Sequence, residues 1–122
     1  MGDRAAATDR RKALGGCHVS EYLAALHLML KGCRIVALRY RTKLGEIDIV
    51  ARKRNLAIFV EVKAGREEMS AIDAVPPTAQ NRIRAASDLW LARQRDYAVL
   101  SKRYDIVAIL PGRLPRHLPN AF

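Results

Sequence analysis

Two strand-like segments joined by a short polar connector constrain the fold of this chain more than any other feature. Residues 46–51 (EIDIVA) and 56–64 (LAIFVEVKA) are rich in β-branched and aromatic residues, and the connector RKRN is short and polar. This pattern predicts an antiparallel hairpin. If the turn centres on Arg54 and Asn55, the numbers of facing residues sum to 109. Lys53 then lies opposite Leu56, and Asp48 lies opposite Glu61.

The segments around the hairpin predict an α/β fold. A helix is expected where apolar residues recur at helical spacing before Gly32, namely at Val19, Tyr22, Leu23, Leu26 and Leu30. A second helix is expected to begin at Pro77 or Thr78. The predicted elements are, in order, helix 14–30, strands 33–41, 46–51 and 56–64, helix 77–94 and strand 104–110. This α-β-β-β-α-β order implies a mixed central sheet flanked by helices.

The length of 122 residues fits one domain, which we place at residues 13–111. Residues 1–12 are expected to be a flexible basic tail, and residues 112–122 an irregular, proline-rich one. The sequence contains no run of 18 apolar residues and begins without the apolar core of a secretory signal. We therefore expect a cytoplasmic protein with no membrane partner.

The charge of the chain favours a polyanionic partner. There are 22 Lys and Arg against 12 Asp and Glu, which gives a formal net charge of +10. Nucleic acid is the usual partner of so basic a chain, although a small basic protein need not have one. Aromatic residues are few, which disfavours a single-strand binder built on base stacking. The candidate nucleic-acid contacts are Arg39, Arg41, Lys43, Arg82 and Arg84.

Acids in the most strand-like segments need an explanation. Alternation along a strand puts Glu46 and Asp48 on one face with Ile47 and Ile49 on the other. In the next strand it puts Phe59, Glu61 and Lys63 together, with Glu61 and Lys63 about 6–7 Å apart. Directly opposed carboxylates that are partly withdrawn from water need a proton or a cation between them.

A divalent cation would satisfy the two acids, since Mg²⁺ takes oxygen ligands from one or two carboxylates. Lys63 could then orient or deprotonate a water, or stabilise negative charge developing on a phosphate. These parts suit metal-assisted hydrolysis of a phosphodiester. The alternative is structural, because a Glu-x-Lys pair on an exposed strand is commonly a solvated ion pair worth under about 1 kcal/mol. Asp105, in the last strand, is expected to pair with a neighbouring arginine or to cap the strand.

These motifs resemble a known nuclease pattern. Asp48, a hairpin and then Glu61-Val62-Lys63 resemble the core of the PD-(D/E)xK nucleases, the restriction-endonuclease-like fold. GEIDIVA with FVEVK more closely resembles the YraN-like family of small bacterial proteins, which is similar to the archaeal Holliday junction resolvases. The resemblance extends over nearly the whole chain, through SEYLAALHLMLKG, RYRTKLGEIDIVA, QNRIRAA and YDIVAIL.

The resemblance implies a role for each site residue. Asp48 and Glu61 would be ligands of Mg²⁺ or Mn²⁺, and Lys63 the catalytic lysine. Glu21 matches an acid that often completes such metal sites, although the residues alone favour a helix-surface acid. Two supporting positions also match: Glu46 accompanies the metal ligand, and Gln80 is a polar residue facing the site.

The sequence departs from the family pattern at two positions. Gly65 stands where an arginine is common, with Arg66 next, which puts a role for that arginine in doubt. Ile47 stands where the superfamily name has a proline, a position at which proline is widely replaced.

Three functions are compatible with the sequence. The first is a Mg²⁺- or Mn²⁺-dependent nuclease acting on DNA, with branched or junction DNA among its candidate substrates. The second is a nucleic-acid-binding module on the same fold without catalysis, and the third is a basic interaction protein whose acids form structural ion pairs. Junction cleavage would require two active sites, which makes a homodimer a further expectation.

Overall fold

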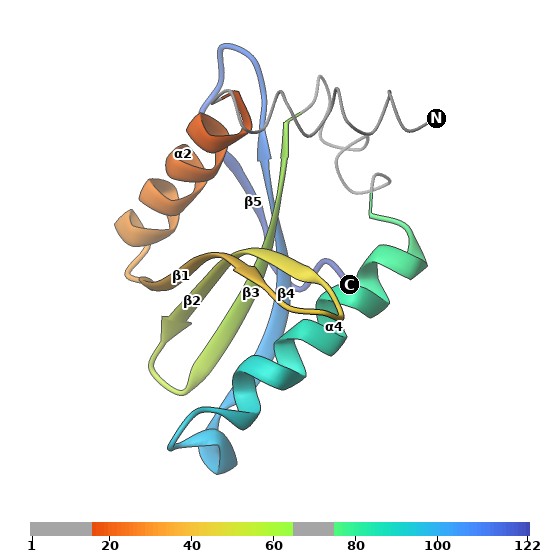
Figure 1. Ribbon diagram of the computed structural model, residues 1–122. Helices are drawn as coiled ribbons and strands as arrows, with labels where there is room; N and C mark the ends of the chain where they lie inside the picture. The colour runs from red at the N-terminus through yellow and green to blue at the C-terminus, as the bar shows by residue number, and fades with distance from the viewer. Residues whose placement is uncertain (1–15, 65–74) are drawn as a thin grey trace.

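The computed structural model describes residues 16–64 and 75–122, and it has the predicted element order (Figure 1). The expected N-terminal tail and the loop with Gly65 and Arg66 lie outside these residues. The elements are α2 (Gly16–Leu30), β1 (Arg34–Arg41), β2 (Glu46–Lys53), β3 (Leu56–Ala64), α4 (Pro77–Ala92), a 3-10 turn (Tyr97–Val99), β4 (Ser101–Ile109) and β5 (Arg116–Leu118). The α/β fold with a mixed sheet is thereby confirmed.

The sheet has the strand order β1-β2-β3-β4-β5. The first three strands form an antiparallel meander, β4 pairs with β3 in parallel, and β5 pairs with β4 antiparallel. A parallel neighbour cannot be reached through a tight turn, so the chain crosses over through α4 between β3 and β4. The crossover leaves β2 and β3 as central strands, which is where the acids of the hairpin lie.

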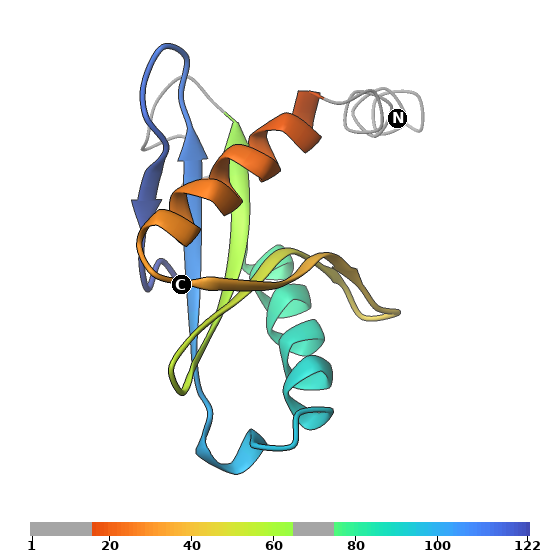
Figure 2. The same ribbon diagram turned by 90° about the vertical axis from the view of Figure 1, so that its left-hand side faces the viewer.

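The two helices cover opposite faces of the sheet, which Figure 2 shows from the side. On one face α4 buries Ile83 and Trp90 against Phe59 and Tyr104, and the ring of Trp90 packs edge-on against Phe59 at 5.7 Å. On the other face α2 packs on a second cluster, made by Ala24, Ala25, Leu28, Cys33, Ile49, Ala51, Ile58, Val60 and Val107. Each face of the sheet therefore has its own apolar core, about one helix wide.

Helix α2 presents an unexpected face to the sheet. The apolar residues that predicted the helix do lie on one side of it, but that side points outward. The residues buried against the sheet are instead the small Ala24 and Ala25, together with Leu28. Helical periodicity defines a face without saying which way it points, and here the small side chains allow the helix to approach the sheet closely.

The predicted side-chain alternation of β2 is wrong at Asp48. Ile47 packs in the cluster under α4 and Ile49 in the cluster under α2, so these two residues do not share a face. Opposite Asp48 in the register of β1 and β2 lies Arg39, whose φ of 50° is left-handed. A left-handed residue does not continue an extended strand, so the regular pleat is interrupted where the acid lies.

The C-terminal segment, expected to be irregular, contains a short strand. Residues Arg116–Leu118 form β5 on the edge of β4, and Ala121 donates its backbone N–H to the carbonyl of Tyr104 at 2.7 Å. The Phe122 ring then stacks on Tyr104 with ring centroids 5.5 Å apart. Prolines are tolerated around an edge strand, and these long-range contacts, absent from any local pattern, order the segment.

Candidate metal and phosphodiester site

The hairpin of β2 and β3 has the predicted register. The paired residues run from Lys53 and Leu56 to Ile49 and Val60, and every pair sums to 109. One step further, the buried Asp48 side chain accepts the backbone N–H of Val62 through Oδ2 at 2.9 Å. This bond fixes the carboxylate of β2 beside the stretch of β3 that carries Glu61 and Lys63.

The carboxyl group of Glu61 has a raised pKa that lies close to neutral pH. Burial raises its pKa, the charge of Asp48 and a hydrogen bond with Asp48 raise it further, and Lys63 opposes them, so the pKa reaches about 7. The Lys63 ammonium lies 3.3 Å from Glu61 Oε2, and both side chains are partly exposed. One lysine therefore does not offset the burial of Glu61 beside a second acid.

The donor set of this acid pair suits a small divalent cation. Asp48 and Glu61 provide carboxylate oxygens, the ligands that Mg²⁺ and Mn²⁺ prefer. A carboxyl group that retains its proton up to a pH of about 7 beside another acid is in a position where a cation can replace the proton. Asp48 and Glu61 are thus the residues that would hold the metal.

Glu21, the third predicted metal ligand, is paired with an arginine. It is buried in α2, and its Oε1 accepts a hydrogen bond from Arg39 Nη1 at 2.9 Å. Arg39 lies opposite Asp48 in the register of β1 and β2, and its side chain is engaged with the helix acid. Within residues 16–64 and 75–122, no three His, Cys, Asp or Glu side chains are grouped closely enough to hold a metal ion.

The two supporting residues have local partners. Glu46 Oε1 is 2.8 Å from Arg41 Nε, an exposed ion pair across the first two strands. Gln80 donates to the carbonyl of Val75 at 2.9 Å and accepts a 3.5 Å hydrogen bond from Arg84, so its amide is occupied at the start of α4.

Comparison with known proteins assigns the chain to a family. The family model described as "Uncharacterised protein family UPF0102" matches residues 20–109, which include Glu21, Asp48, Glu61 and Lys63. The chain belongs to the UPF0102 family. It is 68% identical to a UPF0102 protein of Rhizobium etli (strain CIAT 652) over the full length of both chains. It is 64% identical to one of Rhizobium meliloti over 94% of each chain, and 58% identical to one of Agrobacterium fabrum over 93%.

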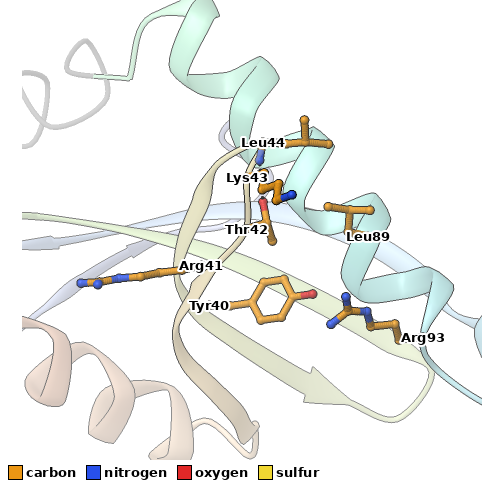
Figure 3. A pocket seen from close by; sticks show the side chains of 7 residues that line it. All are labelled: Tyr40, Arg41, Thr42, Lys43, Leu44, Leu89 and Arg93. Atoms are coloured by element: carbon orange, nitrogen blue, oxygen red, sulfur yellow. Dashed lines mark hydrogen bonds between the residues drawn. The ribbon is translucent and has the colours of Figure 1, made fainter.

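This UPF0102 chain has a pocket between the tip of the β1–β2 hairpin and α4. Its volume is about 640 Å³. Figure 3 shows its lining: the Tyr40 hydroxyl points toward the Arg93 guanidinium, whereas Arg41 points away from both. The remaining lining residues are Thr42, Lys43, Leu44 and Leu89. The lining combines three basic residues, Arg41, Lys43 and Arg93, with an aromatic ring, and it contains no acid.

The hairpin tip that forms this pocket is fixed by short contacts. Thr42 Oγ1 accepts the backbone N–H groups of Leu44 and Gly45 at 3.0 Å and donates to the carbonyl of Gly45 at 2.8 Å. A Cβ on Gly45 would lie 2.5 Å from the carbonyl oxygen of Arg82, so only glycine lets the tip approach α4 so closely. These contacts fix the backbone of the hairpin tip, which carries the exposed Lys43.

The five predicted basic contacts therefore divide into two groups. Arg39 and Arg41 are engaged with Glu21 and Glu46, and Arg84 stacks over the rings of Tyr104 and Phe122 at 5.3 and 5.5 Å. Lys43 and Arg82 are exposed at the hairpin tip and on α4. Arg93 is not among the predicted contacts, although it lies eleven residues after Arg82, a spacing that keeps both on one side of a helix.

Asp105 of β4, whose side chain is fully buried, has more partners than the one arginine that the sequence predicted. Arg103 contacts both of its carboxylate oxygens at 2.8 Å, His117 Nε2 lies 2.6 Å away, and the Asn120 N–H is 2.9 Å away. Lys31 can only donate to the other ring nitrogen of His117, so Nε2 carries the hydrogen toward Asp105. Burial by itself raises the pKa of Asp105, but these hydrogen bonds outweigh it and lower the pKa to about 2. The expected pairing with a neighbouring arginine is confirmed, and the C-terminal partners are new.

In the described part of this UPF0102 protein, no helix is both long and apolar enough to cross a membrane.

Proposed function

We propose that this UPF0102 protein is a divalent-metal-dependent nuclease of the PD-(D/E)xK type that hydrolyses phosphodiester bonds in DNA. The observation that carries the proposal is the pair Asp48 and Glu61, brought together on neighbouring strands with the pKa of Glu61 raised to about 7. Lys63 at 3.3 Å from Glu61 completes the set that the sequence predicted. A purely structural role does not account for an acid pair that costs folding energy at neutral pH.

Asp48 and Glu61 would hold Mg²⁺ or Mn²⁺, which when bound supplies positive charge that activates the scissile phosphate toward attack. Asp48 is fixed for this role by the N–H of Val62, which aims one carboxylate oxygen and leaves the other for a cation. Lys63 projects beside Glu61 as a partly exposed ammonium. It would stabilise the negative charge that develops on the phosphate, as preorganised donors do in phosphoryl transfer.

The basic pocket supports DNA as the substrate. It begins at Tyr40 and Arg41, which pair with Ile47 and Glu46, the residues immediately before Asp48. Lys43 and Arg93 would neutralise backbone phosphates, and Tyr40 offers the pocket an aromatic ring. A DNA backbone that follows the hairpin from its tip would then reach the acid pair.

A DNA-binding module without catalysis is the second candidate, and one observation favours it. The acid expected to complete the metal site, Glu21, is held by Arg39 at 2.9 Å. Glu21 can join Asp48 and Glu61 only if this ion pair opens. A protein in which the pair stays closed would bind DNA through its basic pocket and leave the phosphodiester intact.

Cleavage of labelled DNA tests both candidates. Branched and linear duplexes are incubated with Mg²⁺ or Mn²⁺ and the wild type, Asp48→Asn, Glu61→Gln or Lys63→Met, with Asp88→Asn as control because Asp88 is an exposed acid paired with Lys102. We expect cleavage by the wild type and the control and at least about 100-fold less by the three site variants, all of which retain DNA binding. Salt-dependent binding without cleavage under either metal would support the binding module, and cleavage by Glu61→Gln at the wild-type rate would refute the site.

A further inference from the structure

Helix α2 exposes an apolar face that the sheet does not use. Six large side chains on it are between 43% and 79% exposed, namely those of Val19, Tyr22, Leu23, Leu26, Met29 and Leu30. The residues of α2 that are buried, such as Ala24 and Leu28, are on the opposite side. We refer to the six exposed residues as the α2 face.

The α2 face has the geometry of a helix-packing surface. At 100° per residue its six positions fall within an arc of about 120°. Val19, Leu23, Leu26 and Leu30 follow one another at steps of four, three and four, the spacing at which one helix packs along another. Leu38 of β1 extends the face, because it pairs with Ile49, whose side chain packs under α2.

We propose that the α2 face is the interface of a homodimer, in which α2 of one copy packs along α2 of a second copy around a two-fold axis. Isolated apolar side chains on a surface are ordinary, but a contiguous set of this size exceeds what a soluble monomer usually leaves in water. Six large side chains and Leu38, each more than a third exposed, offer several hundred Å², which approaches the roughly 800 Å² per partner of a standard interface.

The distribution of charge selects a second copy as the occupant. The chain has a net charge of +10, so two copies repel each other over most of their surfaces. Helix α2, by contrast, contains no Lys, Arg or Asp, and its one acid, Glu21, is buried and paired with Arg39. Two copies can therefore approach at the α2 face without bringing like charges together, whereas a nucleic acid finds no cation on it.

The dimer interface leaves the DNA-facing parts of the chain free. The α2 face belongs to the helix on one side of the sheet. The pocket at Lys43 and Arg93 is formed by the hairpin tip and α4, the helix on the other side (Figure 1). A two-fold dimer would thus carry two acid pairs and two basic pockets, which is the arrangement that a cut on two strands requires.

Sedimentation equilibrium of the full chain without DNA or metal tests the interface, so the result does not depend on nuclease activity. We expect the wild type to have twice the 13.6 kDa chain mass at micromolar concentration. Leu26→Glu places a charge in the middle of the α2 face and should weaken association at least 100-fold. Leu114→Glu, at an apolar residue that is 84% exposed elsewhere, should not change it.

Folding of the variants is checked by circular dichroism, and Leu26→Ser repeats the test without adding a charge, with an expected weakening of about tenfold. A wild type that remains monomeric at about 100 µM, or a folded Leu26→Glu variant that dimerises like the wild type, would overturn the proposal.

Discussion

Two buried or partly buried acids on neighbouring strands, Glu61 and Asp105, have opposite electrostatic environments. Asp105 faces the α2 side of the sheet and receives four hydrogen bonds, which lower its pKa to about 2. Glu61 follows Val60, the register partner of Asp105, and has Lys63 and a second acid as neighbours, so its pKa rises to about 7. The fold can satisfy a buried carboxylate fully, and at Glu61 it does not.

The partners of the two acids indicate a structural role for Asp105 and support the proposed functional role of Glu61. The donors to Asp105 come from β4, β5 and the C-terminal residues, so its charge joins the end of the chain to the sheet. At Glu61 the raised pKa supports the proposed cation site, because perturbed acids of this kind concentrate at functional sites. Each of the following substitutions alters one side of this comparison.

The largest effect is expected at Asp105. Asp105→Ala leaves Arg103 and His117 without their buried acceptor and should lower the free energy of unfolding by about 3–5 kcal/mol. Denaturant unfolding at pH 7 measures the change. The exposed Asp88→Ala, whose partner Lys102 is 49% exposed, serves as control and should change it by less than about 0.5 kcal/mol. A loss below about 1 kcal/mol at Asp105 would show that its hydrogen bonds do not hold the C-terminal segment.

The two acids should give the stability curve slopes of opposite sign. The pKa of Asp105 is lowered on folding, so its contribution is present above about pH 4 and is lost as the pH falls toward 2. The pKa of Glu61 is raised from 4.5 to about 7, so the free energy of unfolding should fall by up to about 3 kcal/mol as the pH rises between these values.

Glu61→Gln isolates the second slope. The variant should lack the decline between pH 4.5 and 7 and be more stable than the wild type at pH 8 in metal-free buffer, because no charge needs to be buried beside Asp48. Urea unfolding at half-unit pH intervals measures both curves. Parallel curves for the variant and the wild type would mean that Glu61 titrates normally.

The smallest effect is expected at Lys63. Lys63→Met removes the group that lowers the pKa of Glu61, so that pKa should rise further, by less than about one unit because the pair is partly exposed to solvent. A carbon-detected NMR titration of the Glu61 carboxyl group measures it, with Lys53→Met on the same hairpin as control. An unchanged or lower pKa would separate Lys63 from the site.

Much of the site could be predicted because it is local. The register of β2 and β3 depends on a short turn and on apolar alternation, so pairing residues that sum to 109 placed Asp48 beside Glu61. The same reasoning assigned Ile47 and Ile49 to one face and failed, since it assumed a regular pleat. The left-handed residue opposite Asp48 is Arg39 of the neighbouring strand, and the sequence of β2 contains no signal of it.

The features that sequence reasoning missed depend on contacts over long distances. The partners of Asp105 include His117 and Asn120, twelve and fifteen residues away, beyond prolines that suggest irregular structure. The periodicity of α2 correctly gave one apolar face, but only the sheet decides that Ala24 and Leu28 face inward and that Leu26 remains outside. The pocket likewise depends on the close approach of Gly45 to Arg82.

Titration of the protein with Mn²⁺ tests whether a divalent cation binds at Asp48 and Glu61. Binding is followed calorimetrically at pH 6 and pH 8 for the wild type, Asp48→Asn, Glu61→Gln and the control Asp88→Asn. We expect one site in the wild type and the control, with tighter binding and less proton release at pH 8, and loss of that site in both other variants. Equal binding by the wild type and Glu61→Gln, or no binding by the wild type at millimolar Mn²⁺, would contradict this expectation.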